Sequence, residues 1–252
     1  MEGPKGETKE GAATGAAIAS CLYVLITFFM LIQQPGKATY DTRAELTERP
    51  GSFLSGAFTL WHPESNLGEF QNQAYGYLFP QGTWFVVTDT LSVSPWISQR
   101  LWSALILIVA CEGARRVGRA IGLSSLPALL VGVVFAFSPR LLGTVAVQTG
   151  ESLPGAVMPW LVLAVLLHLQ GRLSPLRTAA LSGAAVVCMG GVNAVETAAC
   201  LPLAMILVVW GATGDHLVGQ AGGVDGVYQN LRICFSGLSD EHHLVRLGDT
   251  EV

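Results

Sequence analysis

A run of 26 residues without a charged side chain, Gly11 to Gly36, is the feature that most constrains what this chain can form. About 20 consecutive apolar residues are enough to cross the hydrocarbon core of a bilayer as an α-helix. In lipid, only a helix or a closed barrel satisfies the backbone hydrogen bonds of such a segment. Lys5 and Lys9 precede the run, as in a secretory signal, but its apolar core is longer than a usual signal core and no small-residue cleavage site follows at 34–37. The run therefore predicts an uncleaved membrane span.

Further apolar segments follow, which indicates a protein that crosses the membrane several times. Of the 252 residues, 51% are hydrophobic and only 13% are charged, and the mean hydropathy is +0.49. These are too few charges to solvate a globule of this size. The predicted fold is an all-α, polytopic helical bundle of about six spans, with a long first loop at residues 34–95. The predicted spans are residues 13–33, 96–114, 120–138, 154–171, 178–192 and 195–211.

Arginines in the short loops set the predicted orientation, because positively charged loops stay on the cytoplasmic side of a membrane. They are Arg115, Arg116 and Arg119 between the second and third spans, and Arg172 and Arg177 between the fourth and fifth. Both loops should then be cytoplasmic, together with residues 1–12. The same alternation places the loop 34–95 on the outer side.

Several classes of function do not fit the sequence. The formal net charge is −4, and the Lys and Arg residues are scattered, without the basic face of a nucleic-acid-binding protein. The five cysteines show no CxxC spacing and fall mostly in apolar runs, so they are predicted to be small buried side chains. No P-loop, HExxH or Ser-His-Asp pattern is present. No metal site and no nucleic-acid partner are predicted.

An apolar stripe in the loop 34–95 predicts a juxtamembrane helix. Leu54, Phe58 and Trp61 recur at helical spacing after Pro50, a residue suited to a helix start. The stripe could lie in the membrane interface, where Trp and Phe are favoured, or it could pack on the bundle.

Amide and aromatic side chains are interleaved between Gln71 and Phe85. Amides offer paired hydrogen-bond donors and acceptors, and aromatic faces line many ligand pockets. Gln71, Asn72, Gln73 and Tyr75 are therefore candidate carbohydrate-binding residues. Ordinary packing at the membrane interface accounts for the same composition.

Three charged side chains lie close to apolar spans on the predicted outer side, where a charge is costly and is a functional candidate. Asp41 suits a general base that takes a proton from an attacking sugar hydroxyl, although it or Thr42 could instead cap a following helix. Arg140 could hold the phosphate of a lipid-linked donor or reach lipid phosphates in general. Glu151 could orient an acceptor hydroxyl, pair with Arg140 or stabilise a helix N-terminus. Glu196 is interpreted as structural or lipid-facing.

Several short motifs follow one another in an informative order. The most specific is the run QNQAYGYLFP at residues 71–80. The others are Tyr40-Asp41-Thr42-Arg43, Ser98-Gln99-Arg100-Leu101-Trp102, Ser138-Pro139-Arg140, Glu151-Ser152-Leu153-Pro154 and Gly190-Gly191-Val192-Asn193-Ala194. From about residue 15 to 210 the chain resembles the N-terminal part of the alpha-(1→3)-arabinofuranosyltransferases. These are membrane glycosyltransferases of the GT-C class that build the arabinan of arabinogalactan and lipoarabinomannan.

This resemblance implies a polyprenyl-phosphate arabinose donor, an arabinan acceptor on the outer side of the plasma membrane, and no nucleotide. It implies no definite cofactor and leaves a divalent metal open. In that class an acidic residue early in the first outer loop is taken as the base, which assigns that role to Asp41. Arg140 would then contact the donor phosphate, and Glu151 would place donor or acceptor. The implied reaction inverts the sugar, so one base suffices and no covalent intermediate is needed.

The resemblance also sets an expectation about length. Family members are far longer than 252 residues, and residues 212–252 look unlike the family. We expect a cytoplasmic N-terminus at 1–12, a GT-C-like transmembrane domain at 13–211, and a disordered or frameshifted tail at 212–252. The alternatives are a mannosyltransferase of the same class that uses polyprenyl-phosphate mannose, and a non-catalytic truncated membrane protein.

Overall fold

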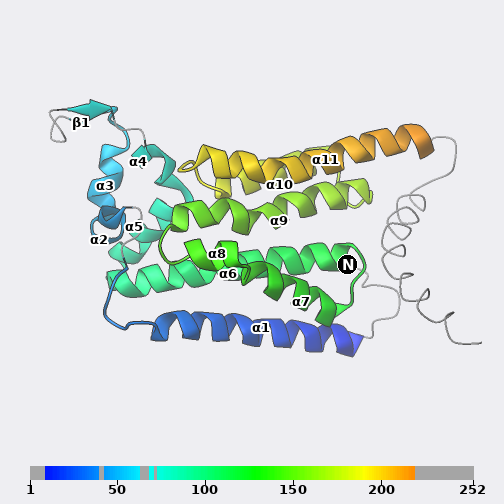
Figure 1. Cartoon of the computed structure of the whole chain (residues 1–252), viewed down its shortest axis with the longest axis horizontal. Coiled ribbons are helices and arrows are strands. Elements are labelled where there is room, and N and C mark those ends of the chain that lie inside the picture. Colours follow the sequence, from blue (N-terminus) through cyan, green and yellow to red (C-terminus); the bar gives the residue numbers. More distant parts are fainter. Residues whose placement is uncertain (1–8, 40–42, 63–67, 71–72, 219–252) are drawn as a thin grey trace, which may run out of the picture.

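The computed structural model describes residues 9–39, 43–62, 68–70 and 73–218, and within these ranges the chain is almost entirely helical. Long helices lie side by side as a bundle, and short elements gather at one end of it (Figure 1). The predicted all-α helical bundle is confirmed. In chain order the elements are α1 (Lys9–Ile32), α2 (Ala44–Glu48), α3 (Pro50–Gly56), β1 (Trp61–His62), β2 (Glu69–Phe70), α4 (Gln73–Gly76), the π-helical turn η1 (Leu78–Gly82), α5 (Thr83–Thr90), α6 (Pro95–Ala120), α7 (Ser125–Ala136), α8 (Pro139–Thr144), α9 (Thr149–Leu169), α10 (Pro175–Cys188) and α11 (Ala194–Val218).

Four described helices are long and apolar enough to cross a membrane: Glu10–Ile32 of α1, α6, α9 and Ala194–Gly211 of α11. Helices α7 and α10 coincide with the other two predicted spans but have only 12 and 14 residues, short of the roughly 20 that a span needs. Proline disfavours a helical conformation in the residue before it, and Ser138, before Pro139, is extended. Within the third predicted span, residues 120–138, only α7 is helical beyond the last residue of α6, and α8 begins directly after the span.

Helix α6 continues through the arginines that were predicted to form a loop, and it ends at Ala120. Within it, Glu112 accepts hydrogen bonds from Arg115 Nε at 2.7 Å and from Arg116 Nε at 2.6 Å. Residues three and four apart lie on one face of a helix, so this group of charges is compatible with continued helix. The hydroxyl of Tyr23 in α1 also donates to Glu112, at 2.5 Å. The cluster therefore ties α1 to α6.

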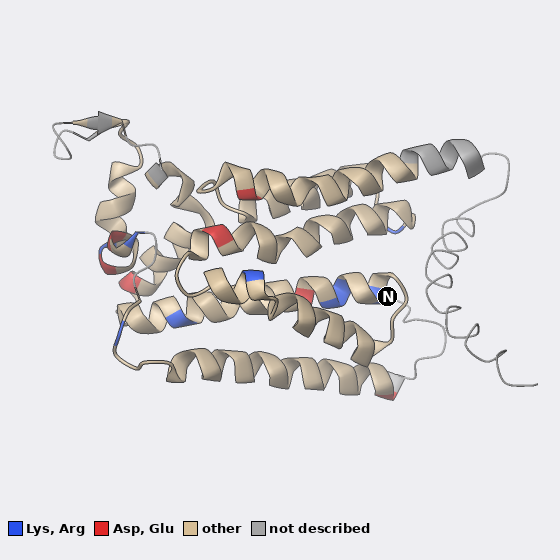
Figure 2. Cartoon of the chain, in the orientation of Figure 1, with Lys and Arg blue, Asp and Glu red and all other residues tan. Residues whose placement is uncertain are grey.

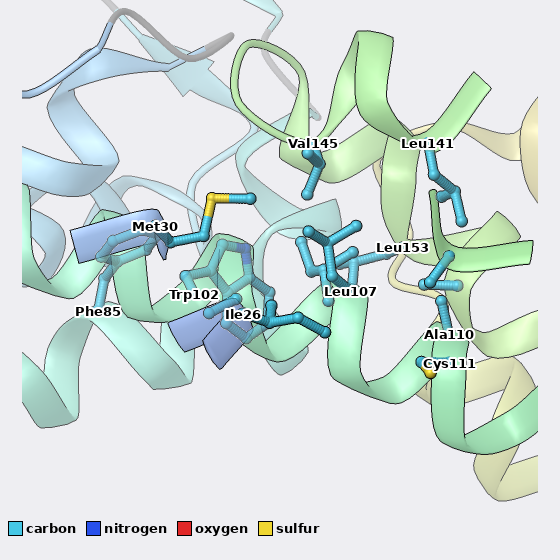
Figure 3. Packing of buried hydrophobic residues seen from close by; sticks show 14 of the residues in the cluster. Ile26, Met30, Phe85, Trp102, Leu107, Ala110, Cys111, Leu141, Val145 and Leu153 are labelled. Carbon is cyan, nitrogen blue, oxygen red and sulfur yellow. The ribbon is translucent and has the colours of Figure 1, made fainter. Parts of the chain in front are cut away.

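Helix α6 is the centre of the bundle, because α1, α7 and α9 all pack against it. Leu107 and Cys111 of α6 have no exposed surface, and Ile26 and Met30 of α1 belong to the same buried cluster (Figure 3). A glycine lets α7 approach closely: a Cβ at Gly132 would lie 2.5 Å from the carbonyl oxygen of Cys111. Figure 2 shows that most of the bundle carries neither acidic nor basic residues, as expected for helices in lipid.

The apolar stripe Leu54, Phe58 and Trp61 does not form one helix, so that prediction is correct only for its beginning. Helix α3 ends at Gly56, with Leu54 packed against the bundle core and Phe58 78% exposed. Trp61 lies in β1 and pairs with Phe70 of the antiparallel β2, with 5.4 Å between ring centroids. Contact between aromatic rings across two strands stabilises such a pair. Trp61 is therefore in a strand and does not continue α3.

Candidate functional site

Polar side chains are buried at the end of the bundle that carries the short elements. They are each 9% exposed or less: Gln81, Thr88, Ser98, Gln99, Arg100, Ser103, Thr144, Thr149 and Ser152. They come from η1, α5, the start of α6, α8 and the start of α9. Buried polar groups in native proteins are hydrogen-bonded, and in a membrane protein they mark functional sites by default. We therefore take this polar end of the bundle, defined by these residues, as the candidate site.

The amide of Gln99 holds the chain that leaves α1. The Thr39 N–H donates to Gln99 Oε1 at 2.8 Å, and Gln99 Nε2 donates to the Thr39 carbonyl at 2.7 Å. The Thr39 hydroxyl donates to the Ala146 carbonyl at 3.2 Å. Thr39 is two residues before Asp41, the predicted base, which lies outside the described residues. The structure thus anchors the approach to Asp41 without describing Asp41 itself.

A second set of contacts anchors the start of α9. Gln81 Nε2 donates to Thr149 Oγ1 at 2.7 Å, and the Ser152 hydroxyl donates to that of Thr144 at 2.9 Å. The Ser103 hydroxyl donates to the carbonyl of Val145 at 3.1 Å. These bonds join η1 and α8 to the start of α9, and they join α6 to Val145 at the end of α8. The polar end of the bundle is therefore a single connected unit.

Charged residues lie at the starts of three helices around this unit. Arg140, in the first turn of α8, forms an ion pair with Glu196, in the first turn of α11. Their side chains are 60% and 28% exposed, so the pair lies at the rim. The hydrogen bond that Arg140 donates to Glu196 raises the pKa of the Arg140 guanidinium, and the charge of Glu151 in the first turn of α9 adds to this effect. The structure therefore gives Arg140 a carboxylate partner, and Glu196, interpreted from sequence as structural or lipid-facing, supplies it.

The amide-aromatic segment serves mainly to dock the short elements on the bundle. Tyr77 is 2% exposed and meets the ring of Phe53 edge-on at 5.8 Å between centroids. Gly191 N–H donates to the Gly76 carbonyl at 3.1 Å, and a Cβ at Gly76 would lie 2.5 Å from the Gly191 carbonyl oxygen. Tyr75 is 68% exposed and remains available to a ligand.

The side chains of the three amides predicted to bind carbohydrate lie outside the described part of the chain. Gln71 and Asn72 lie outside the described residues, and Gln73 begins α4 with a side chain that is likewise outside the description. Within the described ranges, no group of three His, Cys, Asp or Glu side chains could hold a metal ion.

Arg100 is the charged residue of the polar end of the bundle, and the sequence assigned it no role. It is 2% exposed, and its Nε is buried without a hydrogen-bond partner among the described residues. A charged residue in the second turn of a helix long and apolar enough to span the membrane is a signal that the sequence does contain. Gln99 and Gln81 were harder to select from the sequence, because an uncharged amide in an apolar segment does not indicate which residue it will bond.

Comparison with known proteins identifies close relatives of this chain. The family model described as alpha-(1->3)-arabinofuranosyltransferase, N-terminal GT-C domain, matches residues 25–220. A protein of Mycolicibacterium smegmatis named alpha-(1->3)-arabinofuranosyltransferase is 46% identical over 181 residues, which are 71% of this chain and 13% of that protein. The protein of the same name from Mycobacterium tuberculosis is 44% identical over 184 residues, again 71% of this chain and 13% of the relative.

Solved structures give the same result. The cryo-EM structure of arabinofuranosyltransferase AftD from mycobacteria superimposes with a TM-score of 0.70 and 40% identity, over 77% of this chain and 14% of that one. A mutant of that protein gives a TM-score of 0.73 and 38% identity, over 82% of this chain and 16% of that one. The chain is thus a membrane protein that spans about an eighth of the length of the curated relatives it matches.

Proposed function

This chain belongs to the alpha-(1->3)-arabinofuranosyltransferase family, matching its N-terminal GT-C domain, and on that premise we propose that it carries an arabinose-transfer site. The proposed donor is arabinofuranose on a polyprenyl phosphate, and the proposed acceptor is the arabinan of arabinogalactan or lipoarabinomannan. The site would face the outer side of the plasma membrane. The observation that carries the proposal is that the family match, residues 25–220, includes every residue of the polar end of the bundle.

The proposed reaction is a single displacement. The oxygen of an acceptor hydroxyl attacks the anomeric carbon of the donor sugar from the face opposite the phosphate. The bond from that carbon to the phosphate oxygen breaks, and polyprenyl phosphate leaves with the electron pair. The hydroxyl proton passes to Asp41, the general base. Inversion in one step needs one base and no covalent sugar intermediate.

Support for Asp41 comes from the family motif and from its chain neighbour. Both backbone polar groups of Thr39 are bonded to the buried amide of Gln99. A base is effective when the chain around it is held in a fixed geometry. Such anchoring beside Asp41 is what a transfer site requires.

Arg140 and Glu151 are assigned supporting roles at the rim. In this proposal Arg140 contacts the donor phosphate and Glu151 places the acceptor or donor. Because Arg140 is already paired with Glu196, a phosphate would have to share or displace that carboxylate.

The base assignment is tested with the whole chain in detergent, a labelled polyprenyl-phosphate arabinofuranose and a synthetic arabinan oligosaccharide. Asp41→Asn should abolish transfer while leaving the melting temperature unchanged, because only the proton acceptor is lost. Asp89→Asn, the same change on the exposed end of α5, is the matched control and should transfer at the unaltered rate.

Three results would contradict the proposal. Full activity in Asp41→Asn would remove the base assignment. Transfer from polyprenyl-phosphate mannose in place of arabinose would mean that the sugar is wrong, and no transfer at all from the unaltered chain would mean that the chain is not catalytic.

A further inference from the structure

Arg100 is a buried cation that requires a counter-charge. Arg100 is only 2% exposed. Its buried Nε has no hydrogen-bond partner among the described residues. Removing an ionised group from water is strongly unfavourable unless an opposite charge and hydrogen bonds replace the water. A guanidinium in this position is therefore suited to receive an anion.

Helical spacing places Arg100 on the side of α6 that faces the α8–α9 connection. Residues at i, i+3 and i+7 share one helix face, and this relation holds for Arg100, Ser103 and Leu107. Ser103 donates to the Val145 carbonyl, so the face is turned toward residues 145–148. The neighbouring Gln99 holds Thr39, which brings the chain after α1 to the same place.

An apolar groove begins two turns further along the same face. It has a volume of about 380 Å³ and lies between α1 and the segment 137–146. Leu25 and Phe29 of α1, Leu107 of α6, and Leu142 and Val145 line it, and Gln33 is the polar residue in its lining. From Leu25 to Gln33 the helical rise is about 12 Å. A groove of this length and character fits an aliphatic chain rather than a sugar.

The groove and Arg100 are linked through one face of α6. Leu107 lines the groove and follows Arg100 by two helical turns, and Val145 both lines the groove and accepts from Ser103 between them. Figure 3 shows Leu107 and Val145 beside Ile26 and Met30, which also line the groove. A molecule with a long apolar chain and a terminal phosphate fits this arrangement, with its chain in the groove and its phosphate at Arg100.

We propose that Arg100 is the principal ligand of the phosphate of the polyprenyl-phosphate carrier, that Arg140 contacts this phosphate only from the rim, and that the carrier chain lies in the groove between α1 and α8. This assignment rests on the proposed function for the identity of the carrier. A guanidinium forms paired hydrogen bonds to phosphate oxygens. Arg100 is buried, and its Nε has no hydrogen-bond partner in the part of the chain that the structure describes, whereas Arg140 is exposed and bonded to Glu196. The negatively charged phosphate of the carrier is the counter-charge for the Arg100 guanidinium.

The test measures binding and needs no sugar transfer, so its result is independent of whether the chain is catalytic. Native mass spectrometry of the whole chain in detergent gives the affinity for polyprenyl phosphate and for the uncharged polyprenol. Arg100→Gln should weaken polyprenyl-phosphate binding at least tenfold and leave polyprenol binding unchanged. Arg177→Gln, on an exposed arginine at the opposite end of the bundle, is the matched control and should bind both lipids normally.

A second pair of variants tests the groove. Leu142→Trp fills the groove and should weaken both lipids about equally. Leu130→Trp makes the same change on α7 at a residue that is 63% exposed and outside the groove lining, and it should change neither affinity. Should Arg100→Gln not fold, Arg100→Lys retains the charge without the paired donors and should still bind polyprenyl phosphate several-fold less tightly.

Three outcomes overturn the proposal. Polyprenyl phosphate could bind Arg100→Gln or Arg100→Lys as tightly as the unaltered chain, which would mean that Arg100 is neutralised by the protein itself. Arg140→Gln could cause the larger loss, which would return the phosphate to Arg140. Leu142→Trp could leave both lipids unaffected, which would place the chain of the carrier elsewhere.

Discussion

Replacing Gln99 by methionine tests whether this buried amide holds the chain beside the proposed base. Methionine keeps the length of the side chain but removes both bonds to the Thr39 backbone, at 2.8 and 2.7 Å. Gln99 is 1% exposed, so water does not readily replace it. A buried polar group left without a partner costs about 1–3 kcal/mol. Because Thr39 is only half-buried, we take the low end for each of its two groups and expect a loss of about 2 kcal/mol.

Amide hydrogen exchange at Thr39 measures this loss directly. About 2 kcal/mol corresponds to roughly 30-fold faster exchange when local opening controls the rate. Gln99→Glu keeps an acceptor for the Thr39 N–H but loses the donor to its carbonyl, so its exchange rate should lie between those of the methionine variant and the unaltered chain. Arabinose transfer should fall in the same order, because Asp41 is two residues further along the chain.

The matched control is Gln170→Met. At the opposite end of the bundle, it removes the hydrogen bond from Gln170 Nε2 to the Ala120 carbonyl at 2.8 Å and the longer one from Arg172 Nη1 to Gln170 Oε1 at 3.4 Å. It should lower the melting temperature without accelerating exchange at Thr39. An unchanged exchange rate at Thr39 in Gln99→Met would refute the reasoning, and equal acceleration in Gln170→Met would show a global rather than a local effect.

Two further predictions concern packing and the rim. Gly132→Ala places a Cβ 2.5 Å from a carbonyl oxygen of α6 and should destabilise the fold by about 1–3 kcal/mol through overpacking. Gly183→Ala, with open space around its Cβ, should stabilise α10 by about 0.5–1 kcal/mol. Thermal unfolding of both variants in detergent measures these changes. Glu196→Gln breaks an exposed ion pair and should cost only about 0–1 kcal/mol. If Arg140 also contacts the donor, its release in Glu196→Gln should lower the KM for the polyprenyl-phosphate donor, and an unchanged KM would argue against that contact.

Helices of this protein could be predicted because apolar length and the absence of water leave a lipid-embedded backbone no other structure. Their ends were harder to predict. Helix α6 continues past Arg115 because Glu112 pairs with arginines three and four residues later. The sequence contains this spacing, but a prediction of spans from hydropathy does not take ion pairs into account. Helix α7 ends earlier than expected because Pro139 follows it.

The site was predictable in residue type and not in pairing. Arg140 and Glu151 were selected as charges near apolar spans, and both lie around the polar end of the bundle. Asp41 was selected too, and it lies outside the described residues, so its role as base stays a prediction. The partner of Arg140 is 56 residues away, that of Gln99 is 60 and that of Gln81 is 68. Local spacing carries no information about contacts at such distances.

By itself, the sequence determined that this chain forms apolar helices in a membrane and belongs to a recognisable family of transferases, because both follow from the order of residue types along the chain. Only the tertiary structure decided which polar side chains meet. It joins Gln99 to Thr39, pairs Arg140 with Glu196, and buries Arg100 two helical turns from Leu107, which lines an apolar groove. The physical reason is that a buried polar group must find its partner in space, and packing of the helices, rather than their own composition, sets which groups come within reach.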